Sequence, residues 1–182
     1  SREKHVRPVS IDYGTVFTGN DFNVDPMTAV IGQYDGWEFR IADEVYLNNS
    51  DTYKMGHALI EKKYKGAKII PDSTAGNRKT SGKSDLQILK DLEFSIESTR
   101  NPFVTDRVNN LNRLFTENRI VIDPKCKKLI NDLEKVSWKN NELDQSGTNK
   151  HLTHISDALG YLCWKLCPIS LEKGSVRQEK IR

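Results

Sequence analysis

The sequence predicts an α/β fold in which helices flank a mixed central sheet. Three segments of strand character follow one another between residues 16 and 47, and a helical segment comes next. Short apolar strands then alternate with helices as far as residue 166, which is typical of parallel strands joined by crossovers. With 182 residues, the chain is expected to form a single domain.

The first part of the chain is predicted to be an antiparallel three-strand meander followed by a crossover helix. The strands cover residues 16–22, 28–33 and 37–47, and turn-forming sequences separate them. Residues 48–51 supply Asn, Ser and Asp as caps for the helix, which is expected to end near Gly66.

Strands and helices alternate in the rest of the chain. Residues 67–72 form a short apolar segment typical of a central parallel strand, and a loop rich in Gly and Ser follows it. Asp123-Pro124 is typical of a helix start, because Asp caps the helix and Pro suits its first position. The remaining predicted elements are helices over 85–92, 103–118, 123–137 and 151–166, strands over 94–98 and 120–122, and a surface loop over 139–150.

Composition and charge exclude some classes of protein. No apolar run is long enough to cross a bilayer, and the three cysteines lack a disulfide-framework spacing, so reduced thiols are expected. A net charge of +3 does not by itself indicate nucleic-acid binding, but basic residues gather at 78–83 and again at 125–128. The first residues include neither an initiator Met nor an apolar signal segment, so we expect further sequence upstream.

Three aspartates occupy places from which carboxylates can converge on a divalent metal ion. Asp21 and Asp72 end two strands that can be neighbours in the sheet, and Asp157 lies on the last helix, away from its apolar stripe. Mg²⁺ and Mn²⁺ prefer such oxygen ligands, and two ions about 4 Å apart can assist phosphodiester hydrolysis. Asp12, with Gly14 two places later, competes with Asp21. Asp21 is preferred because a hairpin over 23–33 follows it directly, but the pattern alone does not exclude Asp12.

Three segments resemble the C-terminal nuclease domain of the large terminase subunits of tailed bacteriophages, which are DNA-packaging motors. Residues 20–30 (NDFNVDPMTAV) resemble the opening of that domain, residues 70–76 (IPDSTAG) its second acidic strand, and residues 154–161 (HISDALGY) its closing helix. Asn20 departs from expectation, because a buried strand favours an apolar residue there. The resemblance implies a linker over 1–14, an RNase H-like nuclease domain over 15–167 and a C-terminal tail over 168–182.

The resemblance also implies a metal-dependent endonuclease that cuts concatemeric double-stranded viral DNA. It carries three catalytic metal ligands onto Asp21, Asp72 and Asp157, with two Mg²⁺ or Mn²⁺ ions as cofactors. His154 matches a histidine that some members have one helical turn before the last Asp, where it can ligate metal or orient a water. The implied partners are double-stranded DNA, an N-terminal ATPase domain of the same polypeptide, the portal and the small terminase subunit, in the cytoplasm of a bacterial host.

Basic residues near two of these aspartates are candidates for binding DNA. Arg78, Lys79 and Lys83 follow Asp72, and Lys150 precedes the last helix. Lys and Arg side chains at such places can neutralise backbone phosphates without reading the base sequence.

Three alternative functions compete with the terminase interpretation. Residues 76–84 resemble the phosphate-binding loop of an NTPase, with 120–123 as the acidic strand, but five residues separate its glycines where the motif needs four. The second alternative is another RNase H-like nuclease, such as a resolvase or transposase core, which would use the same metal-assisted cleavage of DNA. A DNA-binding or motor-docking module without catalytic metal is the third alternative.

Overall fold

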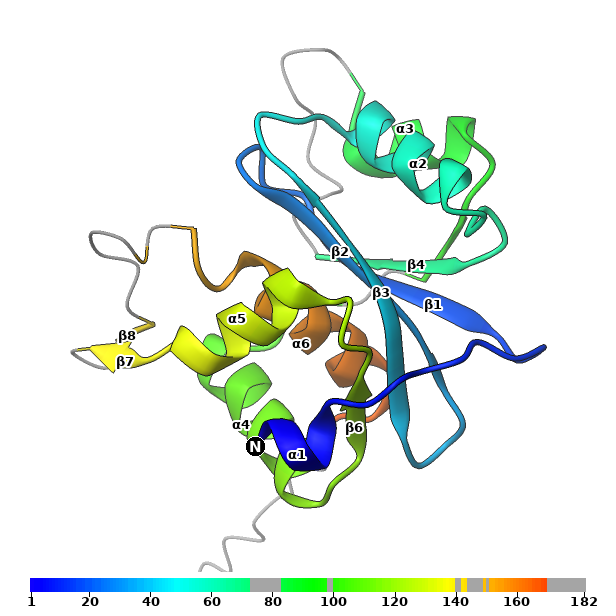
Figure 1. The fold of residues 1–182 in the computed structure, drawn as a ribbon. Helices are drawn as coiled ribbons and strands as arrows, with labels where there is room; N and C mark the ends of the chain where they lie inside the picture. The colour runs from blue at the N-terminus through cyan, green and yellow to red at the C-terminus, as the bar shows by residue number, and fades with distance from the viewer. Residues whose placement is uncertain (73–82, 98–99, 140–141, 144–148, 150, 170–182) are drawn as a thin grey trace, which may run out of the picture.

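A six-stranded mixed sheet runs through the molecule, with helices on both of its faces (Figure 1). The strand order is β5-β4-β1-β2-β3-β6. This confirms the predicted α/β class and the antiparallel meander, which forms β1, β2 and β3. The computed structural model describes residues 1–72, 83–97, 100–139, 142–143, 149 and 151–169.

The strands divide into the meander and three parallel additions. The meander consists of β1 (Val16–Asp21), β2 (Met27–Tyr34) and β3 (Phe39–Leu47). The strands β4 (Lys68–Pro71), β5 (Ser95–Ile96) and β6 (Ile120–Ile122) join in parallel beside β1, β4 and β3 respectively. A separate two-stranded sheet pairs β7 (Trp138–Lys139) with β8 (Glu142–Leu143).

Six helices surround the sheet in the described part of the chain. None of them combines the length and the apolar character that a membrane-crossing helix needs. They are α1 (Arg2–His5), α2 (Thr52–Glu61), α3 (Asp85–Asp91), α4 (Val104–Thr116), α5 (Lys127–Lys135) and α6 (His154–Leu166).

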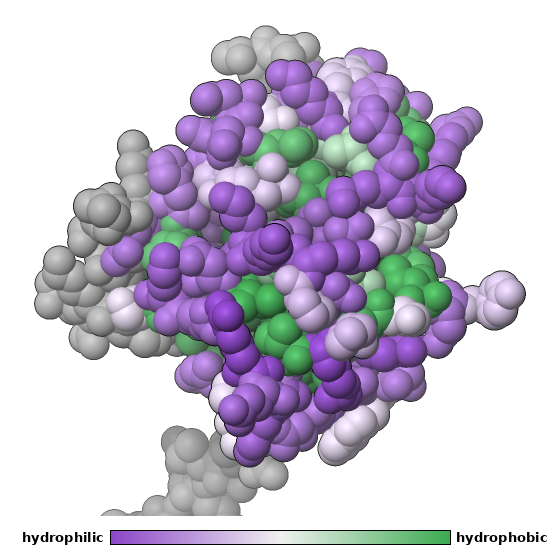
Figure 2. Space-filling model, in the orientation of Figure 1, coloured by the Kyte–Doolittle hydropathy of each residue, from purple (hydrophilic) through white to green (hydrophobic). Residues whose placement is uncertain are grey.

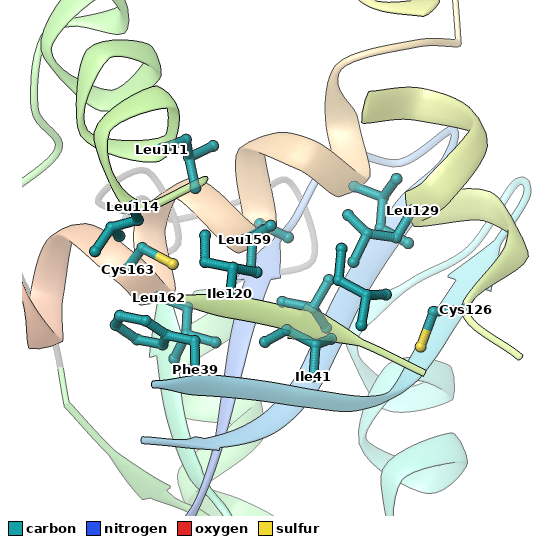
Figure 3. Packing of buried hydrophobic residues seen from close by; sticks show 14 of the residues in the cluster. Phe39, Ile41, Leu111, Leu114, Ile120, Cys126, Leu129, Leu159, Leu162 and Cys163 are labelled. Atoms are coloured by element: carbon teal, nitrogen blue, oxygen red, sulfur yellow. The ribbon is translucent and has the colours of Figure 1, made fainter. Parts of the chain in front are cut away.

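The period of two along each strand divides the core between the two faces of the sheet. Val30 of β2 and Ile70 of β4 belong to the cluster that packs with α4, α5 and α6, part of which is drawn in Figure 3. Their neighbours Ile31 and Ile69 belong to the opposite cluster, which includes residues of α2 and α3. The residues of β1 and β4 that face α6 are therefore predictable from this alternation.

Two helices begin later than the sequence predicts, because carboxylates from other elements cap them. α5 begins at Lys127 instead of residue 123, and Glu44 of β3 accepts hydrogen bonds from backbone N–H groups in its first turn at 2.8 and 2.9 Å. α6 begins at His154 instead of residue 151, behind a cap that Asp132 supplies. The predicted loop over 139–150 contains part of the β7–β8 hairpin.

The N-terminal segment 1–14 contacts the edge of the sheet. Its helix α1 is followed by Val6, which pairs in parallel with Ile122 of β6. His5 is buried, and its Nδ1 lies 3.1 Å from the carbonyl oxygen of Ile120.

Gly19 allows α6 to lie directly on β1. A Cβ placed at this residue would overlap the backbone oxygen of Ala158 and approach the Cβ of Leu162 to 2.8 Å. Any larger residue therefore pushes α6, and the side chains that it carries, away from the sheet.

We predict that Gly19→Ala lowers the free energy of unfolding by about 2 kcal/mol, since overpacking against backbone cannot be relieved by a rotamer change. Gly66→Ala is the matched control, because a Cβ there meets nothing within 4 Å, and its effect is expected to stay below about 0.5 kcal/mol. Urea unfolding followed by circular dichroism measures both variants. Equal stability of the two would contradict the close packing of α6 on β1.

Candidate active site

Asp21 and Asp72 lie side by side at the ends of two parallel strands. The register of β1 and β4 pairs Asn20 with Pro71, and the backbone N–H of Asp72 donates to the carbonyl of Asn20 at 3.1 Å. Gly19 and Ile70, two residues earlier on each strand, face α6, so alternation directs both aspartates to that face. The two aspartates are buried, with 8% and 7% exposure.

Asp132 of α5 fixes the start of α6 above these strand ends. Its buried carboxylate accepts hydrogen bonds from the backbone N–H groups of Thr153 (2.9 Å) and Ser156 (3.1 Å). Thr28 of β2 donates from its hydroxyl to the backbone oxygen of His154 at 3.0 Å. The first turn of α6 is therefore held to the sheet and to α5.

His154 brings an imidazole to the Asp21 carboxylate. Its Nδ1 lies 3.0 Å from Oδ2 of Asp21 and 3.1 Å from the side-chain nitrogen of Asn23. A protonated Nδ1 donates to Asp21, and an unprotonated Nδ1 accepts from Asn23. The hydrogen bond to Asp21 raises the pKa of His154, although burial opposes the increase.

Arg107 of α4 holds Asp157, the third predicted aspartate. The guanidinium donates from Nη2 to Oδ1 of Asp157 at 2.6 Å, and its central carbon lies 4.7 Å from the centre of the Tyr161 ring. A Cβ at Gly160 would lie 2.6 Å from the Arg107 side chain, so the glycine makes room for it. Arg107 is only 4% exposed and contacts the Asp157 carboxylate directly, so it acts by positioning that carboxylate.

Sequence reasoning missed Arg107, although a signal for it exists. Leu111 and Leu114 form the buried apolar stripe of α4, and Arg107 lies on the same side of the helix, four and seven residues before them. A charged residue on a buried stripe requires a buried partner of opposite charge. Here that partner is Asp157.

Asp157 shares a buried region with Asp21, and burial and the negative charge of Asp21 both raise the pKa of Asp157. Burial raises the pKa of Asp157 to about 6, Arg107 lowers it, and the negative charge of Asp21 adds to the increase. Burial also raises the pKa of Tyr161, again opposed by Arg107 and increased by Asp157, Asp21 and Asp72. Three carboxylates are thus gathered around the ends of β1 and β4.

The chemistry of these side chains fits a divalent cation, because hard carboxylate oxygens and local negative charge favour Mg²⁺ or Mn²⁺. Within the described ranges, no three His, Cys, Asp or Glu side chains are already arranged to hold an ion. Asp21 and Asp157 are instead paired with His154 and Arg107. A cation would exchange at least one of these contacts for its own.

Asp12 lies at the opposite end of β1 from Asp21. It precedes the start of β1 at Val16, and its carboxylate accepts from Arg40 and Gln33, each at 2.9 Å. It cannot share a site with Asp72. The structure therefore brings Asp21, and not Asp12, to the end of β4.

The predicted DNA-binding residues lie mostly outside the described residues. Arg78, Lys79 and Lys150 fall there, so their role stays a prediction. Lys83 is exposed and forms an ion pair with Asp91 of α3 at 2.7 Å.

The NTPase alternative requires the loop after β4 to meet the end of β6. β1, β2 and β3 separate these two strands in the sheet. Asp123, at the end of β6, accepts hydrogen bonds from the backbone N–H groups of Val9 and Lys125, both at 2.9 Å. The ends of β4 and β6 are therefore not neighbours in the sheet.

Solved structures of phage large terminases have the same fold. A large terminase from a thermophilic bacteriophage matches 91% of this chain with a TM-score of 0.71 and 17% identity. The P22 large terminase nuclease domain matches 88% of the chain (TM-score 0.70, 16% identity) and is itself covered to 87%. The SPP1 large terminase nuclease domain, with bound Mn, matches 88% of the chain (TM-score 0.60, 19% identity) and is covered to 94%.

The matches cover different shares of the solved proteins. The chain spans 43% of the large terminase from the thermophilic phage, so it corresponds to one part of that protein. No protein-family model and no curated protein sequence matches it. The described chain has the mixed α/β, RNase H-like fold of the nuclease domains of phage large terminases.

Proposed function

We propose that this chain is a metal-dependent endonuclease that cuts double-stranded DNA during viral genome packaging. The observation that carries the proposal is the meeting of Asp21 and Asp72 at the ends of two parallel strands, beneath the helix that bears Asp157. The bound Mn of the SPP1 nuclease domain supports a divalent cation as cofactor. Two Mg²⁺ or Mn²⁺ ions are expected.

The side chains of this chain have distinct tasks in that reaction. Asp21, Asp72 and Asp157 would hold the cations. Once bound, the cations would lower the pKa of a water ligand and polarise the scissile phosphate. Arg107 orients Asp157 and partly neutralises it. His154 can hold a proton at Nδ1 next to Asp21, or leave that carboxylate free when Nδ1 accepts from Asn23.

The partners expected from the terminase resemblance belong to the same proposal. The large terminase from the thermophilic phage has also been solved in complex with ADP, which supports an ATPase within that longer protein. An ATPase domain on the same polypeptide, the portal and the small terminase subunit stay predictions for this chain. The cytoplasm of a bacterial host is likewise a prediction.

Cleavage of supercoiled plasmid tests the proposed function. We expect nicked and linear DNA with Mg²⁺ or Mn²⁺ and no cleavage with EDTA, because cations are needed to activate the water and to offset the repulsion between the carboxylates and the phosphate. Gel electrophoresis over time measures the rate. Cleavage that persists in EDTA would contradict metal dependence, and DNA binding without cleavage at any cation concentration would favour a non-catalytic module.

A further inference from the structure

A polar groove lies between α5, the first turn of α6 and the end of β3. It encloses about 740 Å³. Hydrophilic residues cover most of the face that includes α5 (Figure 2). The residues that line the groove include Asn48, Asn49, Lys128, Asn131, Lys135 and His151.

The groove lies at the same end of the sheet as the candidate active site. Asp25, which lines it, lies in the turn that joins β1 to β2, four residues after Asp21. β3 is antiparallel to β2, so Asn48 and Asn49 follow β3 at the same end of the sheet at which Asp21 ends β1. On α6, the lining residue Ile155 comes directly after His154.

The side of α5 that faces the groove carries donors in a row. Lys128, Asn131 and Lys135 have the spacing i, i+3 and i+7, which places them on one side of a helix. The Lys128 ammonium lies 4.9 Å from the centre of the Tyr46 ring, which also lines the groove. The ion pairs of the described residues include neither Lys128 nor Lys135.

The two acidic residues of the lining are already engaged with backbone donors. Asp132 accepts from Thr153 and Ser156 at the start of α6. Asp25 accepts from the backbone N–H of Asn49 at 3.2 Å. The groove thus offers ammonium and side-chain amide groups to a ligand, and these groups contact phosphate and sugar oxygens in protein–DNA complexes.

We propose that this groove binds the sugar–phosphate backbone of the DNA strand next to the phosphate that is cut. The proposal rests on the proposed function, and it extends the substrate contacts from the carboxylates to α5. Lys128 and Lys135 neutralise phosphates, and the amides fix the path of the strand. Because backbone contacts do not read bases, binding at the groove does not depend on sequence.

The test measures DNA affinity without cleavage. A short fluorescent duplex is titrated in EDTA with the full chain and the doubly substituted Lys128→Gln/Lys135→Gln variant, over about 50 to 200 mM salt. At the upper end of this salt range, we expect the doubly substituted variant to have a roughly tenfold larger dissociation constant than the wild type. We also expect its slope of log Kd against log salt concentration to be smaller, by the amount that corresponds to about two lost phosphate contacts. Fluorescence anisotropy provides both quantities.

The control variant is Lys4→Gln/Lys63→Gln, which removes the same charge. Both of its lysines are exposed and lie outside the groove lining. The groove is supported if this control keeps the wild-type salt dependence, and overturned if both variants lose the same affinity and slope. Thermal unfolding checks that both variants fold.

Plasmid cleavage separates failure of the groove from failure of the proposed function. A protein that cuts plasmid with cations, while the groove variant binds DNA as the wild type does, overturns the groove alone. A protein that never cuts, while the groove variant binds more weakly than the control, overturns the nuclease function and retains the groove as a DNA site.

Discussion

Asp72→Asn is expected to slow cation-dependent plasmid cleavage roughly a hundredfold or more, since loss of even an outer-sphere partner of a metal typically costs about 10–100-fold. The amide keeps the size of the buried side chain but removes its negative charge, so the fold is expected to persist. Initial rates of nicking with Mg²⁺ and Mn²⁺ measure the effect.

The matched control for this substitution is Asp12→Asn. Asp12 is exposed and is paired with Arg40 at the opposite end of β1, so its removal is expected to leave the cleavage rate within about twofold. The proposed metal ligands would be wrong if Asp72→Asn kept the wild-type rate. They would also be wrong if both substitutions slowed cleavage equally.

Arg107→Met is expected to lower the free energy of unfolding by about 3 kcal/mol, because it leaves a buried carboxylate without its cation. Met retains an apolar chain under α6 and so limits the cavity. With the guanidinium gone, the pKa of Asp157, about 6 in the native chain, is expected to rise further. Urea unfolding near neutral pH measures the stability.

Arg2→Met controls for the loss of a guanidinium as such. Arg2 pairs with Glu134 at 2.6 Å on the surface, and such pairs contribute less than about 1 kcal/mol. A loss for Arg107→Met no larger than that for Arg2→Met would mean that the buried pair does not position Asp157.

The strand ends were predictable from sequence because strand periodicity and turn residues are local. Asp21 and Asp72 each follow a run of strand residues, and their placement on one face comes from alternation. Their pairing depends on the register of β1 and β4, which are about 50 residues apart in the chain and which no local pattern encodes. Because this register cannot be predicted from the sequence, Asp12 also remained an alternative to Asp21 as the metal ligand near Asp72.

The helix starts and the buried arginine were harder to predict because their partners are distant in sequence. Glu44 caps a helix more than 80 residues later, so Asp123 wrongly appeared to be the cap. Asp132 caps α6 from the preceding helix. Arg107 meets Asp157 only after α4 and α6 have packed together. Non-local polar partners thus decide details that periodicity cannot.

The most direct test of the account is a crystal structure of the chain soaked with Mn²⁺, with anomalous scattering used to locate the ions. The account predicts anomalous peaks between the carboxylates of Asp21, Asp72 and Asp157, with the Arg107 contact to Asp157 lengthened. Absence of a peak at these carboxylates in crystals that bind Mn²⁺ elsewhere would contradict it.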